Sequence, residues 1–261
     1  IDSAILYFIS SKALALIYSP ITILLITSKL TEVEQGYYFT FASLLGISIF
    51  WAISQGMLAV FPAYAKEYLN ITSVFIINAI LGAAGFGVAF GSFLYTRISK
   101  NYIETGSIPI AAAGLCLMIY LSVNVDSSFS LALIFFGFGV CGGLFVVPLN
   151  SLLQFNAKFE KLGTVLAGSN YFQSLFMLLV LVLTTVVSFN GLNPKSTIYL
   201  LLILTILGAI YTIRKLPLSM VHFFVKFVVG LKYKLEVTGI SNIPSTGGLL
   251  LLGNHVSWLD W

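Results

Sequence analysis

Long apolar runs alternate with short polar connectors along most of the chain. The runs have about the 20 residues that an α-helix needs to cross the hydrocarbon core of a bilayer. Lipid offers the backbone no hydrogen-bond partner, so we expect each run to be a helix. The sequence predicts seven membrane spans, at residues 3–27, 37–64, 73–95, 107–124, 130–154, 167–190 and 197–213.

The composition excludes several other classes of protein. Hydrophobic residues make up 59% of the 261 residues and charged residues 8%, whereas soluble domains carry about 25% charged residues. Cys116 and Cys141 both lie in apolar runs, so we expect no disulfide framework, no metal site and no cofactor. The basic residues are scattered among connectors, which argues against nucleic acid as a partner.

The distribution of these basic residues predicts the orientation in the membrane. The connectors form two alternating sets, and one set with the tail holds ten Lys and Arg, while the other holds two. The basic set comprises connectors 28–36, 96–106 and 155–166 and the tail after residue 213. Cytoplasmic loops carry an excess of Lys and Arg, so we predict a cytoplasmic C-terminal segment.

Glycines are concentrated in the spans at 73–95 and 130–154. Small residues four positions apart, such as Gly87 and Gly91, let helix backbones approach closely. Packing alone is the ordinary interpretation, and the moving interface of a transporter is the alternative. Beyond Gly91, Arg97 begins a basic connector in which Glu104 is the expected ion-pair partner. Gly91, Arg97 and Glu104 form a candidate cytoplasmic-loop motif.

Five segments resemble the second half of bacterial lysophospholipid transporters of the major facilitator type. They are FWAISQ at 50–55, FPAYAKE at 61–67, RISKNYIETGSIP at 97–109, VPLNSLLQ at 147–154 and LAGSNYFQ at 166–173. The resemblance covers residues 46–213, six helices, or one half of such a transporter. It implies movement of lysophospholipid across a bacterial inner membrane. Residues 1–45 instead resemble the N-termini of polysaccharide exporters, and we assign them to a separate helix and connector.

Neutral amides are the polar residues expected near the membrane centre, where the spans hold no acid. A buried amide costs free energy unless it is hydrogen-bonded. Hydrogen bonding between helices is the ordinary interpretation. The functional one is a cavity that binds a head group and takes the acyl tail along apolar walls. The candidate substrate-binding residues are Gln55, Asn78, Asn150, Asn170 and Gln173.

The tail after the last span has two parts. Residues 214–232 form a basic, aromatic-rich stretch that is too short to span and is predicted to be an interfacial linker helix beside membrane lipid. Residues 233–261 change to a soluble pattern, with two apolar segments on either side of a Pro/Gly turn, which predicts strands. We therefore expect an all-α polytopic membrane protein followed by the start of an α/β domain.

The motif GNHVSWLD at 253–260 follows the apolar segment 249–252. A histidine can take a proton from a lysolipid hydroxyl as that hydroxyl attacks an acyl thioester, and an aspartate can orient the imidazole. This H-x-x-x-x-D element resembles the glycerol-phosphate and lysophospholipid acyltransferase family. The resemblance implies an O-acyltransferase with His255 and Asp260 as catalytic residues and acyl-ACP or acyl-CoA as acyl donor.

Three hypotheses for the function stay open. The first is the transporter half of a bifunctional protein that imports and reacylates lysophospholipid. The second is a major facilitator for another small solute with a non-catalytic tail, and the third is a membrane-anchored acyltransferase. The chain begins without methionine and stops at Trp261, so we expect a fragment in which the acyltransferase part is inactive.

Overall fold

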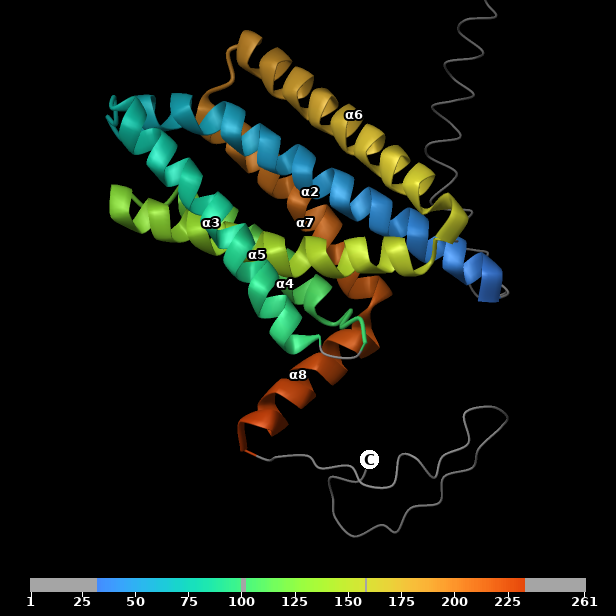
Figure 1. The fold of residues 1–261 in the computed structure, drawn as a ribbon. Helices are drawn as coiled ribbons and strands as arrows, with labels where there is room; N and C mark the ends of the chain where they lie inside the picture. Colours follow the sequence, from blue (N-terminus) through green and yellow to red (C-terminus); the bar gives the residue numbers. More distant parts are fainter. Residues whose placement is uncertain (1–31, 100–101, 158, 233–261) are drawn as a thin grey trace, which may run out of the picture. The chain divides into compact units, whose positions relative to one another are not determined.

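The computed structural model describes residues 32–99, 102–157 and 159–232 (Figure 1). Helices account for nearly all of these residues, and no strand occurs among them. The helices are α2 (Glu32–Tyr68), α3 (Val74–Ile98), α4 (Ser107–Ser122), α5 (Ser128–Phe155), the short η2 (Phe159–Lys161), α6 (Leu162–Phe189), α7 (Pro194–Lys215) and α8 (Pro217–Lys232). The chain divides into two compact units, the first ending at Phe224 and the second beginning at Val225.

Each predicted span from 37–64 to 197–213 coincides with a helix, and so does most of the predicted linker at 214–232. These helix predictions are confirmed. Five of the described helices are long and apolar enough to cross a membrane: α2 from Phe39 onward, α3, α5, α6 and α7. Helix α4 has only 16 residues, slightly fewer than a span of about 17–25 residues. The predicted span at 3–27 and the predicted strands after residue 232 lie outside the described residues.

Two helix starts show how local sequence sets the boundaries. Asn193 accepts a hydrogen bond from the backbone N–H of Ser196 at 2.8 Å, and Pro194 occupies the first turn of α7. Ser73 accepts from the N–H of Ile76 at 3.5 Å before α3. Both caps satisfy an N–H group that has no partner within its helix, and a proline in the first turn loses no helical hydrogen bond.

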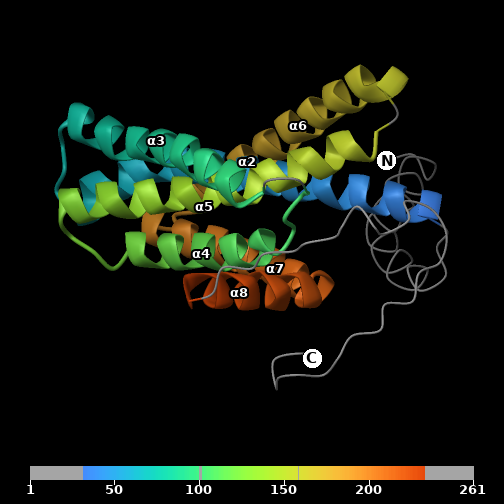
Figure 2. The same ribbon diagram turned by 60° about the horizontal axis from the view of Figure 1, so that its bottom comes forward.

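Helices α3 and α5 cross (Figure 1, Figure 2), and their backbones approach closely at four glycines. A Cβ on Gly87 of α3 would lie 2.9 Å from the Cα of Gly139 in α5, and one on Gly143 would lie 2.6 Å from the N atom of Ser92. Gly91 likewise faces the backbone of Val140. We call the contact made by Gly87, Gly91, Gly139 and Gly143 the glycine seam. The close approach predicted for such glycines is present, and it fits both packing alone and the moving interface of a transporter.

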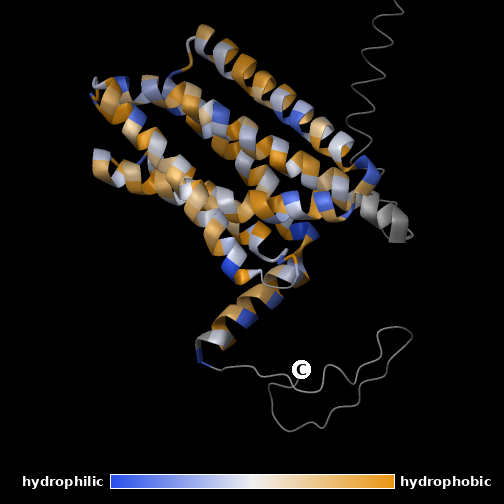
Figure 3. Ribbon diagram, in the orientation of Figure 1, coloured by the Kyte–Doolittle hydropathy of each residue, from blue (hydrophilic) through white to orange (hydrophobic). Residues whose placement is uncertain are grey.

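Hydrophobic residues occur all along the helices (Figure 3), and many of their side chains are exposed. Phe75, Phe86, Phe129 and Phe189 are all largely exposed to the surroundings of the protein. In water such a surface would favour aggregation, whereas lipid is as apolar as these side chains. Together with the five long apolar helices, this surface identifies the described part as an all-α polytopic membrane protein.

Candidate functional site

A cavity of about 880 Å³ lies between α2, α4, α5, α6 and α7. Its walls are mainly aromatic and aliphatic, with Phe50 of α2 against Phe138 and Phe145 of α5 at ring-centroid distances of 6.2 Å. Phe176 and Val180 extend the walls from α6. Binding sites for small molecules have volumes of about 300–1,000 Å³ and mostly apolar linings, so this cavity has the dimensions of a ligand site.

The position of the cavity along the bundle follows from the pairing of α2 with α7. These helices run in opposite directions (Figure 1), and a Cβ on Gly56 of α2 would lie 3.0 Å from the Cδ atoms of Leu201 in α7. The lining residues of α2 all precede Gly56, and those of α7 all follow Leu201. The cavity therefore lies toward the end of the bundle where α2 begins and α7 ends, which we call the Lys215 end.

The polar residues of this lining come from α2 and α7. Thr205 and Thr212 donate their hydroxyl protons to the backbone oxygens of Leu201 at 2.8 Å and Ala209 at 2.9 Å. These hydroxyls therefore present only lone pairs to a ligand. Lys215, the last residue of α7, is half-buried and also lines the cavity. A cation is favourable there because helix C-termini carry partial negative charge.

The amides predicted to bind substrate are not among the residues that line this cavity. Asn150 donates to the backbone oxygen of Val146 at 3.2 Å, and Gln173 donates to the hydroxyl of Ser169 at 2.9 Å, both within their own helices. The other three lie at the surface or near it: Gln55 is half-buried, and Asn78 and Asn170 are exposed. Their assignment to a substrate site stays a prediction.

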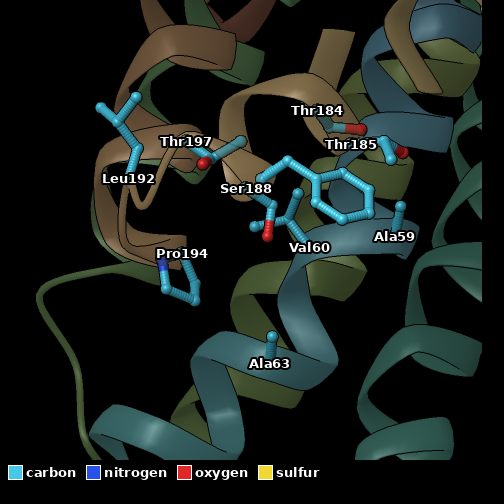
Figure 4. A pocket seen from close by; sticks show the side chains of 10 residues that line it. Ala59, Val60, Ala63, Thr184, Thr185, Ser188, Leu192, Pro194 and Thr197 are labelled. Atoms are coloured by element: carbon cyan, nitrogen blue, oxygen red, sulfur yellow. The ribbon is translucent and has the colours of Figure 1, made fainter. Parts of the chain in front are cut away.

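A smaller cavity of about 290 Å³ lies at the opposite end of the bundle, between α2, α6 and α7 (Figure 4). Hydroxyl groups line it from α6 and α7. Thr184 and Thr185 donate to the backbone oxygen of Leu181 at 2.9 and 2.8 Å, and Thr197 donates to that of Asn193 at 3.3 Å. Sequence analysis missed these residues because threonines in an apolar helix usually satisfy their own hydroxyls in this way.

The three residues of the candidate loop motif occupy different environments. Gly91 belongs to the glycine seam, and the guanidinium carbon of Arg97 lies 5.0 Å from the ring centroid of Phe93. Glu104 is only 7% exposed, and its carboxylate accepts hydrogen bonds from the hydroxyl of Tyr102 at 2.9 Å and the N–H of Gly106 at 3.2 Å. The pairing of Arg97 with Glu104 stays a prediction.

The predicted catalytic pair, His255 and Asp260, lies outside the described residues. Within the described ranges, no group of three or more His, Cys, Asp or Glu side chains is placed to hold a metal ion.

Comparison with known proteins shows that part of this chain is similar to curated transporters. The chain is similar to proteins named lysophospholipid transporter LplT from two strains of Klebsiella pneumoniae, with 29% identity over 159 residues. The match includes 59% of this chain and 39% of each relative, so the chain spans about two fifths of the length of the curated relatives it matches. No family model matches the chain, and no solved structure matches it. The similarity supports a relationship between this chain and lysophospholipid transporters.

Proposed function

We propose that this chain is the membrane part of a protein that moves lysophospholipid across the bacterial inner membrane. The observation that carries the proposal is the cavity of about 880 Å³, with its apolar walls and one lysine in its lining. A lysophospholipid has one acyl chain and one polar head group, which suits such a lining. The similarity to LplT proteins supports the same class of substrate.

The other half of a major facilitator transporter would complete the path for the substrate. Transporters of this type place the substrate near the membrane centre between two related bundles. The six predicted helices within residues 46–213 have the size of one such bundle. In this arrangement the exposed amides Asn78 and Asn170 would bind the head group during its passage, as the sequence predicts.

The proposal is tested by filling the cavity without disturbing the helix contacts. Gly208 lines the cavity, and a Cβ at this position would meet no atom within 4 Å. Gly208→Trp should therefore fold normally and place an indole ring in the space for the acyl chain. We expect at least about a tenfold slower transfer of radiolabelled lysophospholipid into reconstituted vesicles that contain the complete protein.

Ile203→Trp is the matched control for this experiment. Ile203 also lies in α7, but its side chain is 55% exposed and does not line the cavity. The control should transfer lysophospholipid at the rate of the unmodified protein. Equal rates in both variants would show that lysophospholipid does not pass through this cavity, whereas no transfer by the unmodified protein would favour another solute as the substrate.

The orientation of the bundle belongs to the same proposal. We propose that the Lys215 end faces the cytoplasm, because Arg97, Lys161 and Arg214 lie in or beside the connectors at that end and cytoplasmic loops are rich in Lys and Arg. A cysteine introduced at Ser127, between α4 and α5, should then react with an impermeant maleimide from the periplasm. Reaction there only after permeabilisation would reverse the orientation.

A second activity, reacylation of the imported lipid, is proposed from the sequence alone. The H-x-x-x-x-D motif provides a general base, His255, and an orienting carboxylate, Asp260. In the complete protein His255→Ala should abolish the transfer of an acyl group to lysophospholipid and leave its transport unchanged. Separate assays of transport and acylation measure both effects, and unchanged acylation would show that the motif is a chance match.

A further inference from the structure

We propose that Lys215 binds the phosphate of a single-chain phospholipid at the Lys215 end of the cavity, while the acyl chain lies along the apolar walls. This inference rests on the proposed function, since it names the binding mode of the transported lipid. It goes further because it assigns binding of the phosphate to Lys215, which the sequence indicated only as part of a basic, cytoplasmic segment.

The distribution of charge in the lining is the first argument. Among the described residues that line the cavity, Lys215 is the one that carries a formal charge. A lysine ammonium is a common ligand for phosphate, and its hydrogen bonds to an anion are about twice as strong as those between neutral groups. Partial burial strengthens this attraction further because water screens it less.

The geometry of the lysine side chain is the second argument. The four-carbon stem of lysine is apolar and can pack along an apolar wall, while the ammonium group reaches toward polar surroundings. The neighbouring lining residues of α7, Tyr211 and Thr212, are polar and lie one turn earlier. Deeper in the same helix the lining consists of Leu204, Leu207, Gly208 and Ala209, with Thr205 as the polar exception. The lining of α7 thus becomes apolar away from Lys215.

The ligand class follows from these two parts of the lining. A phosphate group occurs in phospholipid head groups and also in free glycerol phosphate, so Lys215 alone does not distinguish them. Phe50, Phe138 and Phe145 provide walls that a small hydrophilic anion would leave uncovered. Removing apolar surface from water contributes about 25 cal/mol for each Å². We therefore assign the site to a lipid with one acyl chain and a phosphate.

Arg214 provides a matched control within the same helix. It is the residue before Lys215, carries the same charge, and is exposed outside the cavity lining. Successive residues of a helix point about 100° apart. Arg214→Gln and Lys215→Gln therefore change the net charge equally at nearly the same place, and only the second removes charge from the cavity. Lys215→Arg retains the charge and should retain most of the affinity.

The experiment measures equilibrium binding to the complete protein in lipid nanodiscs with three radiolabelled probes. Palmitoyl lysophosphatidylglycerol has both a chain and a phosphate, monopalmitoylglycerol has only the chain, and glycerol phosphate has only the phosphate. We expect Lys215→Gln to weaken binding of the lysophospholipid about tenfold and to leave monopalmitoylglycerol unchanged. Arg214→Gln should change each affinity less than twofold, and glycerol phosphate should bind far more weakly than the lysophospholipid.

Each other outcome overturns a definite part of the inference. Equal losses of lysophospholipid affinity in Lys215→Gln and Arg214→Gln would show that the lipid is attracted by the charge of the whole surface. If Lys215→Gln lost affinity equally for lysophosphatidylglycerol and monopalmitoylglycerol, the role of Lys215 would be structural. Tight binding of glycerol phosphate would indicate a site for a free anion. If Lys215→Gln binds normally while Gly208→Trp blocks transport, this inference fails and the proposed function stands. If the unmodified protein binds no lysophospholipid, the proposed function fails.

Discussion

Helices α3 and α6 are both long, apolar and largely exposed, but they contact the rest of the bundle in opposite ways. Helix α3 packs backbone to backbone on α5 through the glycine seam, and its residues line neither of the two cavities. Helix α6 buries only Ser169 and Thr184, and it lines both cavities. Its glycines Gly163 and Gly168 face open space.

The difference shows where this bundle can change its volume. Two backbones in direct contact have no side chains between them that could repack, so we expect the α3–α5 pair to move as a unit. Helix α6 contacts α2 through side chains, such as Val180 against Gly56, and side chains can repack around a ligand more readily than two backbones in contact. We therefore expect lipid binding to change the position of α6 more than that of α3.

The largest expected effect is in the glycine seam. A methyl group on Gly139 would overlap the backbone oxygen of Ala84 and lie 2.8 Å from the N atom of Val88. Because backbone atoms cannot move aside, Gly139→Ala should separate α3 from α5 and cost more than the 1–3 kcal/mol that is typical of overpacking. The unfolding temperature in detergent should fall by many degrees, and little folded protein should be recovered.

The two native cysteines provide the measurement. Cys116 and Cys141 are half-buried, and the chain contains no other cysteine. A dye that fluoresces on reaction with thiols will therefore report unfolding without any added label. An unfolding temperature of Gly139→Ala within about 2 °C of the unmodified protein would mean that α3 and α5 do not pack through their backbones.

The sequence predicted the helices well because length and apolarity depend only on local composition. The predicted span 73–95 corresponds to Val74–Ile98, and 167–190 corresponds to Leu162–Phe189. The close approach of α3 and α5 was also predictable in kind, since glycines four residues apart have few other uses in a membrane helix. Which glycines meet was not predictable, because Gly82 and Gly85 lie in the same apolar helix as Gly87 and Gly91 but face open space.

The candidate site was much less predictable. Apolar residues look alike in the sequence whether they face lipid or a cavity, so Phe138 and Phe145 gave no signal. Lys215 was recognisable in the sequence only as a basic residue at a helix end. Such a residue is explained equally well by the excess of Lys and Arg in cytoplasmic loops. For Asn150 the sequence could not show that its amide turns back to its own helix at Val146. Whether a residue faces lipid or a cavity, and which group its side chain bonds, depends on the residues that surround it in the folded protein.

The smallest effect is expected at Gly168 in α6. A Cβ at Gly168 would meet no atom within 4 Å, and replacing glycine by alanine inside a helix stabilises it by about 1 kcal/mol in water. Gly168→Ala should therefore leave the unfolding temperature unchanged or raise it slightly, in the same thiol assay that shows a large fall for Gly139→Ala. A fall of similar size would mean that, in the complete protein, another segment covers this face of α6 as closely as α5 covers α3. The looser packing of α6 relative to α3 would then not hold in the complete protein. A movement of α6 would no longer explain how the cavity admits a lipid.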